Sequence, residues 1–167
     1  MRVLVVGASG TIGRAVVAEL EQRHEVIAAG RSSGELRTDI TDITAIRTMF
    51  EKVESVDALV SAAGTVKFAP FEDMTEEDYE IGLKDKLMGQ VNLVLVGRDY
   101  LSDGGSFTLT TGVLDTCYEG GRHGSEARKQ HTQFTVGCLD LSGLFHDVPS
   151  SSCIRLRSDR RQWPTTR

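Results

Sequence analysis

The chain has 167 residues, the usual size of one domain, with 40% hydrophobic and 26% charged residues as in ordinary water-soluble proteins. A formal net charge of −5 without a basic stripe excludes nucleic acid as the main partner. No run of 18 apolar residues is present, and the three cysteines lack zinc-ligand spacing, so we expect neither a membrane span nor a metal site. The first residues lack a basic segment and a cleavage site, which predicts a cytoplasmic protein without a secretory signal.

The composition changes near residue 115. Residues 1–114 hold 11 Lys and Arg against 18 Asp and Glu, whereas residues 115–167 hold 8 against 6. All three cysteines, the only tryptophan and three of the four histidines also lie in the second part. We therefore predict a core domain over residues 1–114 and an atypical C-terminal segment of the same domain over residues 115–167.

The N-terminal motif is a strand, a glycine turn and a helix. Residues 3–6 form a short β-branched apolar run, typical of a strand buried on both faces, and residues 14–21 have apolar positions at helical spacing. Between them stand Gly7, Gly10 and Gly13, in the spacing GxxGxxG. Such a turn presents main-chain N–H groups at the positive end of a helix, where a phosphate can bind. We predict that it binds the pyrophosphate of a dinucleotide; the alternative is an ordinary strand-to-helix turn.

The end of the second strand, predicted over residues 24–29, carries Arg31 and Ser32. In dinucleotide-binding units this position faces the adenosine ribose, where a carboxylate selects NAD and an arginine accommodates the 2′-phosphate of NADP. The sequence places no carboxylate beside Arg31, so it predicts that NADP(H) is preferred over NAD(H). The alternative is a solvated arginine on a loop.

Strands and helices alternate along the rest of the core. Further strands are predicted over residues 35–39, 56–61 and 106–111, and helices over residues 43–50, capped by Thr41 or Asp42, and from Thr75 to about residue 101. This order predicts an α/β fold of the Rossmann type, a doubly wound parallel sheet with strand order 3-2-1-4-5. No segment after the fifth strand has a convincing strand pattern, so we expect the sheet to be truncated or irregular there, with an exposed edge.

One face of the long helix is apolar. Its residues are spaced at helical intervals and are Leu83, Leu87, Val91 and Leu95. We interpret this stripe as part of the core or as a dimer interface, and we expect a homo-oligomer.

Residues 1–114 resemble the short-chain dehydrogenase/reductase family. The resemblance rests on five motifs in order, which are GASGTIG at 7–13, AGRSS at 29–33, DITD at 39–42, SAAG at 61–64 and GGSFTLTTG at 104–112. It implies a nicotinamide cofactor and hydride transfer to or from a small alcohol or carbonyl substrate. The expected cofactor-binding residues are Gly7, Ser9, Gly10, Thr11, Ile12, Gly13, Arg31, Ser32, Asp39, Ile40, Ala62, Ala63 and Gly64. Within this set the family places residues 39–40 near the adenine and residues 62–64 near the adenosine ribose.

The catalytic residues of the family are not all present. The family uses a tyrosine as acid and base, a lysine that lowers the pKa of that tyrosine, a serine and an asparagine. Alignment on the family's glycines puts Lys86 at the asparagine and leaves Thr111 as the hydroxyl nearest to the serine. Ser125 stands at the tyrosine position, and a serine hydroxyl cannot replace a phenol as an acid or base. The chain thus resembles divergent members that lack the tyrosine, and its catalytic candidates are Thr111 and Lys86.

Two functions fit these residues. The first is a short-chain-type oxidoreductase that transfers a hydride between NADP(H) and a small carbonyl or alcohol; the second is a catalytically inactive NADP-binding protein. The segment after residue 115 also has two explanations. A shift of the reading frame is one, because moving one base forward across residues 121–124 permits Ala-Ala-Met-Ala, the small-residue helix that the family has there. A divergent segment with its own local structure is the other.

Overall fold

The structure is a computed structural model that describes residues 1–69, 71–110 and 153–157. Its strands are β1 Arg2–Val6, β2 Glu25–Gly30, β3 Leu36–Arg37, β4 Val56–Ser61, β5 Leu101–Thr110 and β6 Cys153–Arg157. Its helices are α1 Thr11–Leu20, α2 Ile43–Val53, the short 3-10 helix η1 Phe71–Asp73, α3 Glu76–Ile81, the π-helix η2 Gly82–Met88 and α4 Gly89–Gly97.

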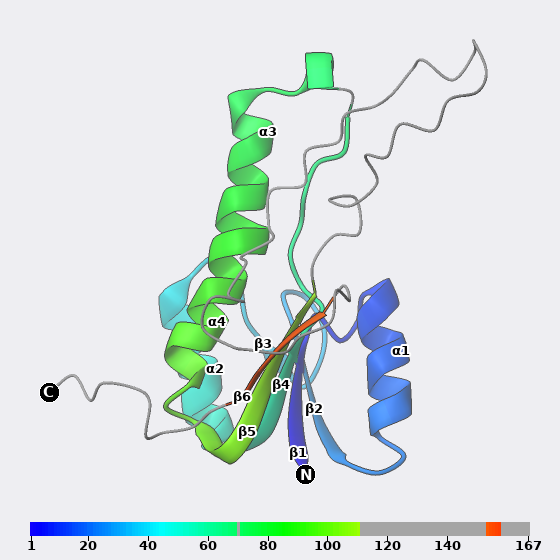
Figure 1. The fold of residues 1–167 in the computed structure, drawn as a ribbon, viewed down its shortest axis with the longest axis vertical. Coiled ribbons are helices and arrows are strands. Elements are labelled where there is room, and N and C mark those ends of the chain that lie inside the picture. Colours follow the sequence, from blue (N-terminus) through cyan, green and yellow to red (C-terminus); the bar gives the residue numbers. More distant parts are fainter. Residues whose placement is uncertain (70, 111–152, 158–167) are drawn as a thin grey trace, which may run out of the picture.

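The six strands form one sheet in the order β3-β2-β1-β4-β5-β6, and the first five are parallel. Helix α1 lies on one face of this sheet, and α2 and α4 lie on the other (Figure 1). The predicted α/β class, the strand order 3-2-1-4-5 and the doubly wound arrangement are confirmed. In such sheets the carboxyl ends of the strands meet at one edge, which is where ligands bind.

Strand β1 is central and contributes to two separate cores. Leu4 and Val6 face the larger core, which they share with α2 and α4, whereas Val3 and Val5 face the smaller core under α1. All four side chains are buried, and burying a side chain of this size contributes about 1.5–3 kcal/mol. The uninterrupted apolar run follows from this, since successive strand side chains point to opposite faces and both faces are covered.

The end of the sheet differs from the prediction. Strand β5 begins at Leu101 and includes residues 102–105, which we expected to form a loop. Strand β6 pairs antiparallel with β5, so the sheet is not truncated after the fifth strand but continues irregularly, which is the second of the two expected alternatives. Residues 154–157 read Ile-Arg-Leu-Arg, a period-two alternation that the surrounding serines and arginines obscured. The open main-chain groups of an edge strand favour such an added partner.

The predicted long helix consists of three successive pieces, α3, η2 and α4, which form one rod that extends beyond the sheet (Figure 1). Its capping box at Thr75 is present, with Asp78 as the second member. The apolar stripe is not core, because Leu83 is 41% exposed and Leu95 is 47% exposed. The residues of α4 that enter the core are instead Leu93, Val94 and Val96.

Candidate functional site

The turn between β1 and α1 is close-packed. Gly7 has a φ of 86°, a left-handed conformation that glycine adopts readily, and its N–H donates to the carbonyl oxygen of Ala29 at 2.8 Å. A Cβ atom on Gly13 would lie 2.0 Å from the carbonyl oxygen of Gly7, so only glycine lets α1 start this close to the strand. Gly10 caps α1 without a side-chain hydrogen bond. The first-turn N–H groups of a helix lack partners within the helix and remain available to an anion.

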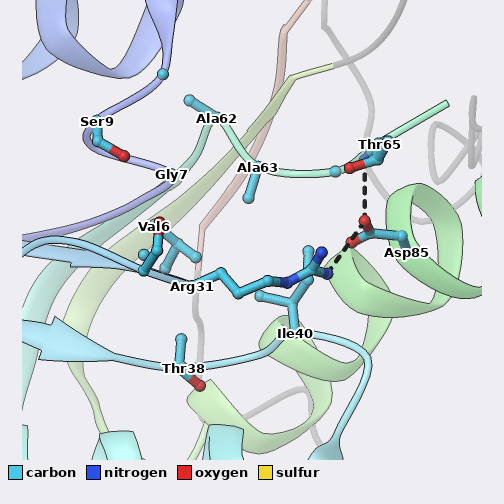
Figure 2. Close-up of a pocket in the computed structure, with 14 residues that line it drawn as sticks. Val6, Gly7, Ser9, Arg31, Thr38, Ile40, Ala62, Ala63, Thr65 and Asp85 are labelled. Carbon is cyan, nitrogen blue, oxygen red and sulfur yellow. Dashed lines mark hydrogen bonds and ion pairs between the residues drawn. The ribbon is translucent and has the colours of Figure 1, made fainter.

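A cavity of about 240 Å³ lies beside this turn, at the carboxyl ends of β1, β2 and β4 (Figure 2). Most of the predicted cofactor residues line it, namely Gly7, Ser9, Gly10, Arg31, Ser32, Ile40, Ala62, Ala63 and Gly64. Lining residues that the sequence did not indicate are Val6, Gly30, Thr38, Thr65 and Asp85. The fold thus gathers residues from five separate stretches of the chain around one space.

The other predicted site residues are placed differently. Thr11, Ile12 and Gly13 form the first turn of α1 and do not line the cavity. Asp39 does not line it either but binds Arg31, which does. Thr111 lies outside the described residues.

Arg31 extends across the cavity between Ala63 and Ile40, with its guanidinium directed at Asp85 (Figure 2). Its Nη2 atom donates to Asp39 Oδ1 and to Asp85 Oδ2, each at 3.3 Å. The expectation that no carboxylate stands beside Arg31 was therefore wrong. Asp39 lies only 8 residues after Arg31 in the sequence, whereas Asp85 lies 54 residues away, so the local sequence could not reveal Asp85.

The two carboxylates differ in burial and in their other partners. Asp39 also accepts hydrogen bonds from the N–H and the hydroxyl of Thr41, and these bonds, with the nearby Arg31, hold its pKa below the usual value. The Asp85 side chain is only 9% exposed and accepts from the N–H of Thr65 at 3.2 Å. Asp85 thus connects the rod to the loop after β4 and to the end of β2.

Lys86 lies next to Asp85 but points to a different neighbour. Its Nζ donates to the carbonyl oxygen of Ala63 and to Thr110 Oγ1, each at 3.0 Å. It packs against Gly64, where a Cβ atom would lie 2.4 Å from the Lys86 side chain. Burial lowers the pKa of Lys86, and the negative charge of Asp85 partly opposes that effect. A partly buried ammonium that contacts a hydroxyl at the end of β5 is suited to hold and transfer a proton.

The π-helix η2 brings these two side chains to the site. Asp85 and Lys86 are consecutive residues of η2, and Gln90 follows in α4 and donates to the carbonyl oxygens of Lys86 and Thr110, each at 3.2 Å. Short π-helical turns are rare in proteins and are frequent at functional sites. Their wider turn changes the direction of successive side chains, which is why the α-helical periodicity of the sequence did not indicate Asp85.

Sequence reasoning missed Asp85 and Thr110. Thr110 is adjacent to the predicted Thr111, and the repeated hydroxyl in TLTT was a signal that either residue could act. For Asp85 no signal of spacing or motif was present. Among the described residues, no helix is long and apolar enough to cross a bilayer, and no group of three or more His, Cys, Asp and Glu side chains is arranged to hold a metal ion.

The strand order, the glycine turn and the cavity at the carboxyl edge define a dinucleotide-binding type of α/β protein. A family model described as "NAD dependent epimerase/dehydratase family" matches residues 3–109. The chain belongs to this family and is a member of the short-chain dehydrogenase/reductase proteins, as its motifs indicated.

Three relatives illustrate the likeness. The crystal structure of the protein lin1944 from Listeria innocua is 52% identical, with a TM-score of 0.67 over 68% of this chain and 57% of that one. A small-chain dehydrogenase in complex with NADPH is 29% identical, with a TM-score of 0.62 over 68% of this chain and 52% of that one. The hydroxynaphthalene reductase-like protein Arp2 of Metarhizium brunneum is 26% identical over 66% of this chain and 50% of its own length. The chain therefore spans about half the length of the curated relative.

Proposed function

We propose that the protein is a short-chain-type oxidoreductase that transfers a hydride between NADP(H) and a small carbonyl or alcohol substrate. The observation that carries the proposal is the cavity beside the glycine turn. Arg31 extends across this cavity, and the Lys86–Thr110 pair lies next to its lining residue Gly64. A solved relative in complex with NADPH supports the cofactor.

The residues of the cavity fit the adenosine and pyrophosphate parts of a dinucleotide. Gly10 caps α1 without a side chain, so phosphate oxygens can approach the free N–H groups of the first turn, which lie at the positive end of the helix dipole. The volume of about 240 Å³ is smaller than the roughly 300–1,000 Å³ of pockets that enclose a whole drug-sized ligand. It therefore suits one half of a dinucleotide rather than all of it.

Arg31 is the proposed determinant of NADP(H) preference. Its side chain is 57% exposed at the cavity, and a guanidinium can donate two parallel hydrogen bonds to a phosphate. Ser32, which also lines the cavity, adds a hydroxyl beside it. We propose that these two side chains bind the 2′-phosphate, while Asp39 and Ile40 lie near the adenine and residues 62–64 lie near the ribose.

The proton of the reaction is assigned to Lys86. When bound, the nicotinamide ring supplies the hydride to a carbonyl carbon or removes it from an alcohol carbon. The carbonyl oxygen must gain a proton in the reduction, and the ammonium of Lys86 is the proposed donor, with solvent restoring its proton afterwards. The hydroxyl of Thr110 accepts a hydrogen bond from Lys86 Nζ, so its own proton can be donated to the substrate oxygen. Thr111 stays a second candidate for the hydroxyl that donates to the substrate oxygen.

Nucleotide binding and turnover test the proposal together. The protein is titrated with NADPH and with NADH, and each binding curve is followed by nucleotide fluorescence. A panel of aldehydes and ketones is then assayed with NADPH, and the corresponding alcohols with NADP. We expect tighter binding of NADPH than of NADH and turnover of at least one carbonyl. Absence of binding by either nucleotide overturns the proposal. Binding without any turnover contradicts the oxidoreductase and favours the inactive NADP-binding protein.

The remaining features of the proposal follow from the sequence. We propose a cytoplasmic protein that acts on small molecules and self-associates through the apolar stripe of the rod. The stripe is half-buried at Leu87 and Val91 and exposed at Leu83 and Leu95. The exposed apolar side chains of Leu83 and Leu95 are the proposed contacts with a second copy.

A further inference from the structure

We propose that Asp85 is a specificity-determining residue of the cofactor site, because its buried carboxylate opposes the negative charge that distinguishes NADP(H) from NAD(H). The inference rests on the proposed nucleotide site and deepens it. It concerns a residue that neither the motifs nor the helical pattern indicated. Asp85 acts on the nucleotide through its charge at the cavity and through Arg31, and it is not itself the proton donor of the reaction.

The cavity carries more negative than positive charge at the proposed 2′-phosphate position. Arg31 Nη2 contacts one oxygen of Asp39 and one oxygen of Asp85, each at 3.3 Å. One positive guanidinium charge therefore lies beside two negative carboxylate charges, and the net charge of the three side chains is negative. A 2′-phosphate that binds Arg31 must approach both of these carboxylates, whereas the 2′-hydroxyl of NAD(H) carries no charge and meets no such repulsion.

Asp85 contributes more to this repulsion than Asp39 does. The Asp85 side chain is 9% exposed and lines the cavity, whereas that of Asp39 is 43% exposed and does not line it. Water screens an exposed charge strongly and a buried one much less. The repulsion between the charge of Asp85 and the 2′-phosphate is therefore screened less than that of Asp39.

The Arg31–Asp85 ion pair also favours the binding of NADP(H), because it holds Arg31 in place. This gain from positioning opposes the repulsion between Asp85 and the 2′-phosphate. The Nη2–Oδ2 separation of 3.3 Å is long for a charged hydrogen bond, which is typically about 2.7–2.9 Å. Arg31 is also largely exposed, and ion pairs with an exposed partner contribute little. The gain from positioning is thus small, and the repulsion of a doubly charged phosphate is the larger effect. Asp85 therefore narrows the preference for NADP(H) that Arg31 creates.

The substitution Asp85→Asn tests this directly. An asparagine keeps a carbonyl oxygen that can accept from the Thr65 N–H, while it removes the charge. We expect the ratio of the dissociation constants for NADH and NADPH to rise about 3- to 10-fold, in the range of a charge–charge effect in a partly closed site. The same rise is expected between 5′-AMP and adenosine 2′,5′-bisphosphate, which differ only in the 2′-phosphate.

Asp78→Asn is the matched control. The Asp78 side chain is 11% exposed, as buried as that of Asp85, and binds Lys67 at 2.8 Å, but it does not line the cavity. This variant loses a comparable ion pair, so its thermal stability falls, while the nucleotide ratio stays that of the unmodified protein. Asp85→Ser, which also removes the charge, replaces Asp85→Asn if the latter does not fold.

The possible outcomes distinguish a failure of the role assigned to Asp85 from a failure of the proposed function. An unchanged or lower ratio in a folded Asp85 variant overturns the role of Asp85, while NADPH binding by the unmodified protein leaves the proposed function standing. An equal rise in the Asp78 variant also overturns the inference, because the effect would then be one of stability. Absence of binding by every nucleotide overturns the proposed function and the inference with it.

Discussion

The glycine turn after β1 and the π-helix η2 contribute to the same site in different ways. The turn contributes main-chain N–H groups and close packing, through Gly7, Gly10 and Gly13. The π-helix contributes two charged side chains, Asp85 and Lys86, that reach different neighbours. A function carried by the backbone depends on residues close together in sequence. A function carried by converging side chains depends on how distant segments pack.

The largest expected effect comes from breaking the turn with Gly13→Val. A Cβ atom there would lie 2.0 Å from the carbonyl oxygen of Gly7, so the start of α1 must move. We expect nucleotide binding to be lost and the free energy of unfolding to fall by about 1–3 kcal/mol, the usual cost of overpacking. Fluorescence titration and denaturant unfolding measure the two effects.

Gly104→Ala is the control for that variant. Gly104 has a φ of 77° and no neighbouring atom within 4 Å of an added Cβ, so the change introduces backbone strain without a clash. The left-handed conformation costs a non-glycine residue about 1–2 kcal/mol. Stability should therefore fall while binding is kept, and a Gly13→Val protein that bound NADPH normally would contradict the assigned role of the turn.

The next largest effect tests the side-chain part of the site, with Lys86→Met. Removal of a positioned proton donor typically lowers kcat about 10²- to 10⁴-fold, and we expect little change in the dissociation constant for NADPH. Lys84→Met is the matched control, because Lys84 lies in the same π-helix and pairs with Glu80 at the exposed surface. Equal losses of activity in the two variants would show that Lys86 has no special role.

The pH dependence of carbonyl reduction sharpens the assignment of Lys86. Only the ammonium form can donate a proton, so kcat should fall as the pH rises through the pKa of Lys86. Burial lowers that pKa below 10.5, so the decrease should be centred below the value of an ordinary lysine. Asp85 raises the pKa of Lys86, and Asp85→Asn should move the decrease to still lower pH. A profile centred at or above 10.5 would exclude Lys86 as the donor.

The smallest expected effect on the folded chain comes from Leu95→Lys on the apolar stripe of the rod. Leu95 is 47% exposed, so its replacement should change the free energy of unfolding by no more than about 0.5 kcal/mol. Self-association, measured by light scattering during size-exclusion chromatography, should weaken. Leu93→Ala is the contrasting variant, since Leu93 is fully buried and its truncation should cost about 2–5 kcal/mol. An unchanged assembly in Leu95→Lys would argue against this interface.

Patterns of hydrophobicity and turn residues predicted the helices and strands well where each pattern covered a single helix or strand. The strand over Val56–Ser61 has the predicted bounds, and Asp42, one of two proposed caps, accepts from the N–H of Thr44. The burial of residues along the rod was harder to predict, because the α-helical spacing of apolar residues continues across η2 although the backbone there is π-helical. The stripe from Leu83 to Leu95 was assigned partly to the core for that reason.

The sequence by itself determined the turn after β1, because strand, glycines and helix are adjacent and their geometry is local. The alternation of apolar runs and amphipathic helices also indicated a parallel sheet with helices on both faces, and the resemblance to the family implied the order of its strands. Only the tertiary structure decided which charges face Arg31 and which groups surround Lys86. Arg31 and Asp85 are 54 residues apart, and Lys86 and Thr110 are 24 apart. Contacts of that kind form when the sheet and the rod pack together, so no local pattern of residues records them.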